Sequence, residues 1–147
     1  MIVSCDGAAR GNPGPAGIGV VLSTPEGRVL DRIARGIGVA TNNVAEYMAC
    51  IEGLRRAAEL GAREVLVRSD SRLLVEQLAG RFRVRNPRLA RLHREALDLA
   101  SRFDRVAFQH VPREENRAAD RLANLGVDGE ELSPGRAAGT PPGAPPG

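Results

Sequence analysis

The sequence predicts an α/β fold in which helices flank a five-stranded mixed sheet. Three short apolar segments joined by turns open the chain, and two further apolar segments then alternate with helical ones, an order typical of such a sheet. The length of 147 residues suits one domain with a single hydrophobic core. With 42% hydrophobic and 27% charged residues, the composition favours a folded globular protein over a disordered chain.

The five strands are predicted from apolar runs and from the turns between them. A short apolar run opens the chain, and a stretch rich in glycine and proline at residues 7–17 separates it from the second run. A Pro-Glu-Gly turn at residues 25–27 makes a hairpin of the second and third strands. The fourth run is apolar on both faces, as expected inside a sheet covered by helices. The predicted strands are residues 2–5, 18–22, 28–35, 64–68 and 105–110.

Four helices are predicted from helical periodicity and from residues that start or stop helices. Thr41, Asn42 and Asn43 are candidate N-caps of the longest helix, and Gly61 is expected to end it. Pro87 suits the first turn of the third helix. The predicted helices are residues 43–60, 72–79, 88–102 and 116–125, with a loop at 111–115.

One folded domain is predicted at residues 1–126. Residues 133–147 hold five prolines and four glycines without apolar periodicity. We therefore expect residues 127–147 to form a disordered Pro/Gly-rich tail or a linker. The sequence leaves open whether a second domain follows it.

The composition and the N-terminal residues also bear on location and partners. The start of the chain lacks the basic and long apolar regions of a signal peptide, and no apolar run approaches the roughly 20 residues of a membrane helix. We expect a cytoplasmic protein without a membrane partner, in which Cys5 and Cys50 stay reduced. All 21 basic residues are arginine and the net charge is +3. This balance is compatible with a nucleic-acid partner, but a G+C-rich genome would also favour arginine.

Four acidic residues are candidates for a functional site, although each has a second interpretation. Glu46 lies on the apolar side of its predicted helix, where the alternative is a first-turn Glu favoured by the helix dipole. Asp6 and Asp70 stand at or just beyond apolar strands, and the strand that ends at Asp70 fits the rule that α/β sites gather at carboxyl ends. An Asx-turn and an N-cap are the alternatives for these two residues. Asp120, taken alone, is typical of a solvated helix face.

Together the four acids indicate a metal site. Carboxylates gathered by a sheet and its helices would repel one another and could not all ionise at neutral pH. A divalent cation would resolve that conflict, and oxygen-only ligands favour Mg²⁺ or Mn²⁺ over Zn²⁺. Two such ions about 4 Å apart would hold the attacking water and the leaving oxygen of a phosphodiester in line.

Four motifs stand in order along the chain, at residues 6–15, 41–46, 69–71 and 110–120. In their residues and spacings they resemble the motifs of type 1 ribonuclease H, and the resemblance covers about residues 1–126. It implies the ribonuclease H-like fold and an endoribonuclease that cuts the RNA strand of RNA–DNA hybrids by a two-metal-ion mechanism, leaving 5′-phosphate and 3′-hydroxyl ends.

The resemblance also assigns roles to individual residues. Asp6, Glu46, Asp70 and Asp120 match the family's metal-binding acids, with Mg²⁺ or Mn²⁺ as the implied cofactor. His110 matches a loop histidine that assists proton transfer or product release, a role suited to an imidazole; the alternative is a strand-end His bonded to backbone. Positions that match contacts to the hybrid are Asn12, Thr41 and Asn42, with backbone groups near Gly7 and Ala9 expected to read 2′-hydroxyls.

The chain departs from the common family pattern at two places. Arg72 stands where many members have a Gln that contacts the minor groove. The basic protrusion of many members, with its Lys and Trp, is missing, and the compact residues 81–94 resemble the archaeal and Bacillus-like branch. Arginines in this stretch could replace the lost phosphate contacts or form a solvated basic face. They are Arg81, Arg83, Arg85, Arg88, Arg91 and Arg94.

The rival interpretations keep the fold but change the substrate. A resolvase or transposase core acting on branched DNA and a binding module without catalysis are the alternatives, and some relatives in the compact branch attack double-stranded RNA. The intact acids argue against a module without catalysis. We expect a monomer whose partner is an RNA–DNA hybrid.

Overall fold

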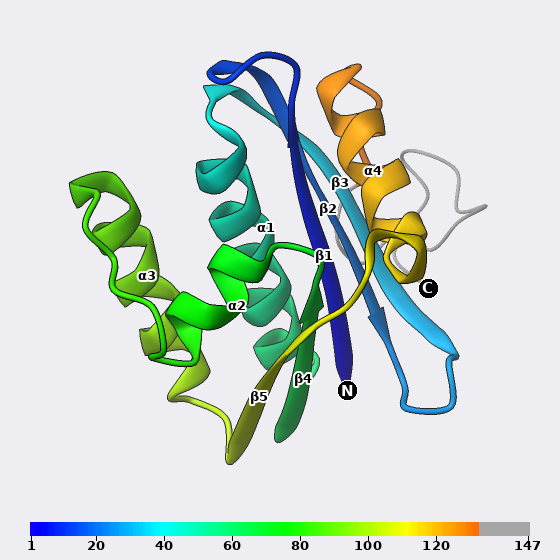
Figure 1. The fold of residues 1–147 in the computed structure, drawn as a ribbon. Coiled ribbons are helices and arrows are strands. Elements are labelled where there is room, and N and C mark those ends of the chain that lie inside the picture. Colours follow the sequence, from blue (N-terminus) through cyan, green and yellow to red (C-terminus); the bar gives the residue numbers. More distant parts are fainter. Residues whose placement is uncertain (133–147) are drawn as a thin grey trace.

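The computed structural model describes residues 1–132 of the chain. Five strands and four α-helices follow one another in the predicted order, with one short 3₁₀ helix before the last α-helix (Figure 1). The strands are β1 (Ile2–Ala9), β2 (Gly14–Ser23), β3 (Val29–Ala40), β4 (Glu64–Ser69) and β5 (Arg105–His110). The helices are α1 (Asn42–Glu59), α2 (Arg72–Leu78), α3 (Pro87–Ala100), η1 (Arg113–Glu115) and α4 (Arg117–Val127).

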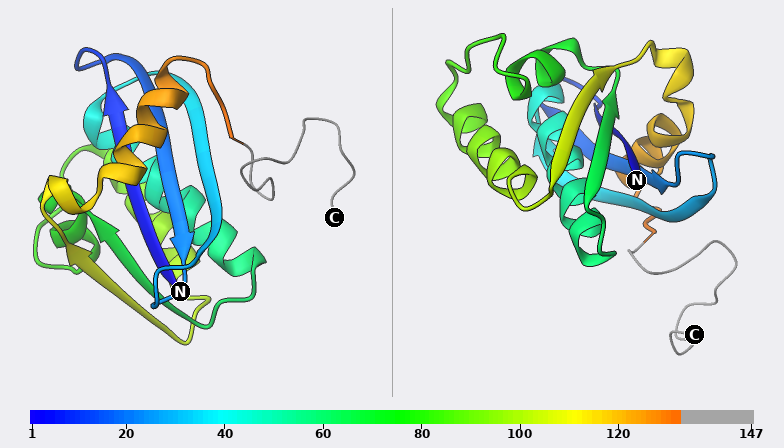
Figure 2. Two further views of the ribbon diagram at one scale, coloured as in Figure 1. Left: turned by 90° about the vertical axis from the view of Figure 1, so that its right-hand side faces the viewer. Right: turned by 90° about the horizontal axis from the view of Figure 1, so that it is seen from below.

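The five strands form one mixed sheet in the order β3-β2-β1-β4-β5. β1, β2 and β3 are antiparallel neighbours, whereas β4 pairs parallel with both β1 and β5. α1 packs on β1 and β2 from one face, with α2 and α3 beside it, and α4 covers β2 and β3 on the other face (Figures 1 and 2). The predicted fold, a five-stranded mixed sheet flanked by helices, is confirmed.

The first three strands are longer than predicted, and this changes the setting of Asp6. β1 continues to Ala9 because the glycine-rich stretch after it still pairs with β2, as in the pair Gly7–Ile18. The prediction that Asp6 stands at the end of its strand was therefore wrong, since the residue lies inside β1. Glycine and proline predicted a turn here. In the folded protein, however, this part of the sheet needs small residues because helices pack closely against it. A Cβ at Gly19, for example, would lie 2.2 Å from the Ala119 carbonyl oxygen of α4.

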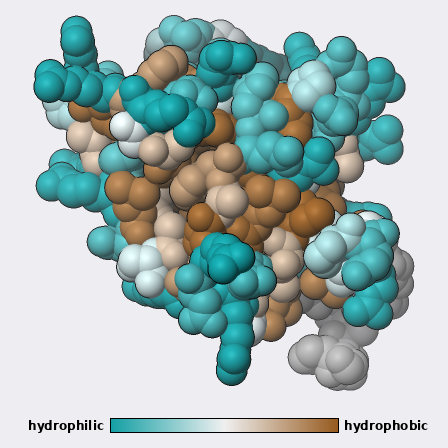
Figure 3. All heavy atoms as spheres, turned by 60° about the horizontal axis from the view of Figure 1, so that its bottom comes forward, coloured by the Kyte–Doolittle hydropathy of each residue, from teal (hydrophilic) through white to brown (hydrophobic). Residues whose placement is uncertain are grey.

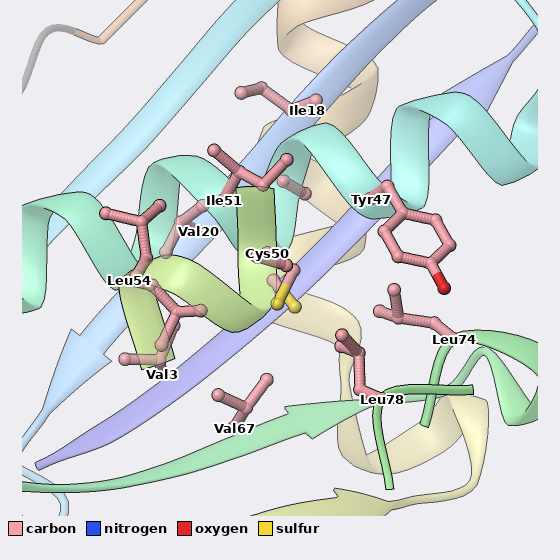
Figure 4. Packing of buried hydrophobic residues seen from close by; sticks show 14 of the residues in the cluster. Val3, Ile18, Val20, Tyr47, Cys50, Ile51, Leu54, Val67, Leu74 and Leu78 are labelled. Carbon is pink, nitrogen blue, oxygen red and sulfur yellow. The ribbon is translucent and has the colours of Figure 1, made fainter. Parts of the chain in front are cut away.

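The core lies between α1 and the sheet and consists mostly of aliphatic side chains (Figure 4). Tyr47 is the largest fully buried side chain in it. Cys5 and Cys50 are both buried and their side chains contact each other, and both cysteines are free, as expected. Packing of α1 against β1 therefore joins the two elements that carry Asp6 and Glu46.

The end of the described chain differs from the predicted tail. α4 runs to Val127, and Leu132 exchanges backbone hydrogen bonds of 2.9 and 3.1 Å with Ala34 of β3. The predicted start of the tail at residue 127 was therefore too early, because residues 127–132 complete α4 and reach the edge of the sheet. The rest of the predicted tail, residues 133–147, lies outside the described residues.

The surface at the end of the sheet nearest the N-terminus has an apolar centre. Figure 3 shows hydrophobic side chains at the centre of this face and hydrophilic ones around it. A shallow hollow there is lined by residues that include Met1, Ile2, Leu66 and Ala107. Within residues 1–132, no helix combines the length and the apolar character needed to cross a membrane.

Candidate active site

Three of the four predicted acids meet at one point of the sheet. Asp6 comes from β1, Glu46 from the second turn of α1, and Asp70 follows the last residue of β4. One carboxylate oxygen from each residue lies within 4.8 Å of the other two. Asp6 and Glu46 are only 5% and 7% exposed. β1 and β4 are parallel neighbours, so their carboxyl-terminal halves present Asp6 and Asp70 to the same crevice.

Glu46 is held in place by a glycine and by two hydrogen-bond donors. A Cβ at Gly7 would lie 2.3 Å from the Ala45 carbonyl carbon, so only glycine allows α1 to approach β1 this closely. The Gly7 amide donates to Glu46 Oε1 at 2.7 Å, and Ser69 Oγ donates to Oε2 at 3.3 Å. The glutamate is therefore bonded to β1 and to the end of β4, the strands that carry or precede its acidic neighbours.

Burial and mutual repulsion favour the protonated forms of these acids. Burial, followed by the charge of Glu46, raises the pKa of Asp6 to about 10. Burial also raises the pKa of Glu46, to about 7, although its contact with Asp6 and the Gly7 amide oppose the shift. The pKa of Asp70 is raised as well, again mainly by burial. Three carboxylates that resist ionisation in the same crevice need a cation to be charged together at neutral pH.

Asp120 reaches the same cleft from the opposite side, on α4. It is not one of the three acids whose oxygens lie within 4.8 Å of one another. It nevertheless lines their cleft, and a hydrogen-bonding contact with it contributes to the raised pKa of Asp6. Its side chain is 31% exposed, and its Oδ1 lies 3.9 Å from Nη2 of Arg113. The structure thus brings all four acids to one cleft, three of them closely.

The acids lie in an open cleft of about 650 Å³. His110, the last residue of β5, lines the cleft and is exposed to solvent. Gly7, Ala9 and Asn42, which are predicted to contact the substrate, line it as well; Asn42 is exposed, and the two others are partly buried. Three other predicted contact residues do not line the cleft: Asn12, Thr41 and Arg72.

Two of the residues outside the lining shape the rim of the cleft. Asn12 Oδ1 accepts from the Asn42 amide at 3.0 Å, and Asn42 Oδ1 accepts from the Ala9 amide at 3.1 Å. Thr41 is the N-cap of α1, with Oγ1 accepting from the Val44 amide at 3.2 Å. The amides of Gly7 and Ala9 therefore already donate to side chains of the protein. Arg72 is the first residue of α2 and is exposed to solvent.

Sequence reasoning missed the residues that attach α4 to the cleft. Asn116 is 2% exposed, and its Nδ2 donates to the Cys5 carbonyl at 2.9 Å, directly before Asp6. Its own carbonyl accepts from the Asp120 amide at 3.1 Å. Arg113 and Asn124 line the cleft beside Asp120. Arg113 could have been noticed from its position three residues after His110, but nothing local in the sequence distinguishes a buried Asn116 from a surface cap.

The fold and the cleft define a class of protein. A mixed sheet in the order β3-β2-β1-β4-β5, with acids from its central strands, from α1 and from α4 in one cleft, is the architecture of ribonuclease H-like nucleases. A family model described as reverse transcriptase-like matches residues 4–126. The chain belongs to the type 1 ribonuclease H family.

Individual relatives agree with this membership. The chain is 49% identical over 129 residues to a bifunctional protein of Mycobacterium tuberculosis, covering 87% of this chain and 35% of that protein. The crystal structure of RNase H1 from Halobacterium salinarum superposes with a TM-score of 0.85 at 42% identity, covering 87% of this chain and 97% of that one. LC11-RNase H1 in complex with RNA/DNA hybrid gives a TM-score of 0.83 at 41% identity, with 87% and 96% covered. The chain therefore spans about a third of the length of the mycobacterial relatives that it matches.

Proposed function

We propose that this chain is an endoribonuclease that hydrolyses the RNA strand of RNA–DNA hybrids with the help of two divalent cations, leaving 5′-phosphate and 3′-hydroxyl ends. The observation that carries the proposal is the group formed by Asp6, Glu46 and Asp70, whose carboxylates converge although burial opposes their ionisation. Nothing in the core requires three acids at this place, and a divalent cation would compensate them. All four acids come from one chain, so a monomer suffices.

The donor atoms of the cleft fit Mg²⁺, with Mn²⁺ as the second candidate. Asp6, Glu46, Asp70 and Asp120 offer oxygen ligands only, and the described residues that line their cleft include one histidine, His110, and no cysteine. When bound, the ions would supply Lewis acidity and charge neutralisation for in-line attack on a phosphodiester. Asp6, at the centre of the group, would contact both.

The remaining residues of the cleft would position the substrate and move protons. His110, exposed at the edge of the cleft, would take up or deliver a proton at the leaving oxygen or assist product release. The rim formed by Asn12, Asn42 and Ala9 would receive the sugar–phosphate backbone next to the acids. We include Thr41 as the cap that fixes this rim.

The proposed substrate rests on the relatives and on the arginines. LC11-RNase H1, which is 41% identical, was solved in complex with RNA/DNA hybrid. In this chain Arg83, Arg85 and Arg88 are exposed and form no ion pair within residues 1–132. We propose that these arginines bind phosphates of the hybrid, and that Arg72, at the start of α2, contacts it between them and the cleft.

The test compares substrates under identical conditions. End-labelled RNA–DNA hybrid, double-stranded RNA, duplex DNA and branched DNA are incubated with the protein and Mg²⁺ or Mn²⁺, or with chelator. We expect cleavage of the RNA strand of the hybrid, only with metal, and almost none by Asp70→Asn. Asp104→Asn, an exposed acid at the far end of the sheet, is the matched control and should retain full activity. Equal cleavage by Asp70→Asn, or preference for branched DNA, would refute the proposal, and preference for double-stranded RNA would change the substrate.

A further inference from the structure

Gln77 is a buried polar residue that the candidate active site does not use. It lies near the end of α2 and is 4% exposed. Its Oε1 accepts from the Tyr47 hydroxyl at 2.6 Å, and its Nε2 donates to the Arg83 carbonyl at 3.1 Å. An unpaired amide at this depth would cost free energy, so both bonds are needed to keep a glutamine in the core.

The chemistry of the partners fixes the orientation of this amide. A backbone carbonyl can only accept, so the Gln77 nitrogen must face Arg83 and the oxygen must face Tyr47. Burial raises the pKa of Tyr47, which keeps its hydroxyl protonated and able to donate. The backbone carbonyl of Gln77 lies 3.0 Å from Nε2 of His93, on α3, and this nitrogen must therefore carry a proton. Gln77 thus joins α1, α2, α3 and the segment between the last two.

Residues 81–86 form the connector between α2 and α3. Its first arginine is neutralised, because Arg81 donates to both carboxylate oxygens of Glu76 at 2.6 and 2.9 Å. Arg83 and Arg85 have no such partner: both are exposed, and neither forms an ion pair with the described residues. The hydrogen bond from Gln77 to the Arg83 carbonyl therefore fixes the backbone of the segment that carries Arg83 and Arg85, the two arginines without an ion-pair partner.

The connector lies within reach of a duplex bound at the acids. Ser71, the N-cap of α2, lines the active-site cleft, and α2 is seven residues long. At 1.5 Å per residue, the connector begins about 10 Å from the cleft. A nucleic-acid duplex carries one phosphate charge per about 1.7 Å of its axis, so one bound duplex can meet the acids and the connector together. Figure 1 shows the connector passing from the end of α2 along α3.

We propose that Gln77 is a positioning residue for substrate binding: its buried amide holds the connector so that Arg83 and Arg85 meet phosphates of the bound hybrid. The inference rests on the proposed function. Gln77 touches neither the substrate nor the acids, and it acts through the Arg83 carbonyl. Free arginine side chains lose conformational entropy on binding, and a fixed backbone lowers that loss.

The first test is a comparison of Gln77→Met with Val65→Ala under steady-state conditions. Methionine keeps the length of the side chain but removes both hydrogen bonds, whereas Val65 is a core residue near the start of β4 and away from the connector. For Gln77→Met we expect KM for the hybrid to rise about fivefold, because the connector is no longer fixed before binding, with kcat unchanged. The salt dependence of KM should become shallower, its logarithmic slope falling by about one. Val65→Ala should lower the melting temperature without changing KM or the slope.

The second test is a double-mutant cycle that does not depend on a core substitution alone. Arg83→Gln combined with Arg85→Gln removes surface charge and should itself raise KM; adding Gln77→Met should then raise KM no further. An unchanged KM in the arginine variant, or additive effects of the two changes, would overturn the inference. Wild-type protein that fails to cut the hybrid would instead refute the proposed function, so the two failures are distinguishable.

Discussion

The two sides of the active-site cleft are built in different ways. On the sheet side, Asp6 and Glu46 are almost fully buried, and Gly7 and Ser69 fix the glutamate through hydrogen bonds. On the α4 side, Asp120 has a side chain that is 31% exposed and faces an arginine. On the sheet side, core packing therefore holds together acids that repel one another. On the α4 side, solvent and Arg113 already compensate the charge of Asp120.

This difference shows where the site opposes folding. Buried acids whose pKa values are raised favour the unfolded state at neutral pH, because the unfolded chain ionises them freely. An exposed acid beside an arginine has little such effect. Substitutions of the acids on the sheet side should therefore change stability and activity together, and substitution of Asp120 on the α4 side should change activity alone.

The largest effect is expected for Asp6→Asn. Asparagine cannot ionise and is a weaker metal ligand, so we expect cleavage of the hybrid to fall by a factor of about 1,000 or more. The metal-free protein should become more stable. The folded pKa of Asp6 is about 10 against an ordinary value of 3.8, so the wild-type free energy of unfolding falls as pH rises from about 4 to about 10.

Thermal melts in chelator from pH 5 to pH 9 measure this effect. Asp6→Asn should melt about 3–6 °C above wild type at pH 8, and the difference should shrink toward pH 5. Added Mg²⁺ should raise the melting temperature of wild type more than that of the variant. A variant that is less stable than wild type at pH 8 would show that the acids do not oppose folding.

An intermediate effect is expected for Gly7→Ala, with Gly19→Ala as its counterpart on the α4 side. The new Cβ would lie 2.3 Å from the Ala45 carbonyl carbon in the first case and 2.2 Å from the Ala119 carbonyl oxygen in the second. Both should lose about 1–3 kcal/mol of stability, because a helix must move away from the sheet. Only Gly7→Ala displaces Glu46, so its kcat below the melting temperature should fall more. Denaturant unfolding measures the stability of both variants, and steady-state kinetics measure their kcat. Equal losses of kcat in the two variants would contradict the expected difference between the two sides of the cleft.

The contrast also explains which parts of the site could be predicted from the sequence. Glu46 was identifiable because a charged residue on the apolar side of a helix conflicts with the pattern around it. Asp70 follows a strand that is apolar on both faces, a local signal for a site at a carboxyl end. The order of the elements and the fold followed from the same local signals and from the family's motifs.

Other features depend on contacts between segments far apart in the chain. The continuation of β1 past Asp6 depends on pairing with β2, which glycines at 7–17 conceal. Asp120 shares its spacing with an ordinary polar helix face, and its place in the cleft comes from Asn116, which bonds to Cys5 from 111 residues away. In the sequence, Gln77 does not differ from an ordinary helix residue, because its contact with the Arg83 carbonyl forms only in the folded chain. Local patterns cannot show such partners.

The smallest effect is expected for Asp120→Asn. The amide keeps the size of the side chain and can still contact Asp6 and, more weakly, a cation, so we expect kcat to fall by only about tenfold. The melting temperature should stay within about 2 °C of wild type, because Asp120 is partly solvated and its pairing with Arg113 at 3.9 Å contributes little. Kinetics over a range of Mg²⁺ concentrations should show that more metal is needed for half-maximal activity. A loss as complete as that of Asp6→Asn would mean that the α4 side is as necessary as the sheet side, and that exposure is a poor guide to an acid's role in this cleft.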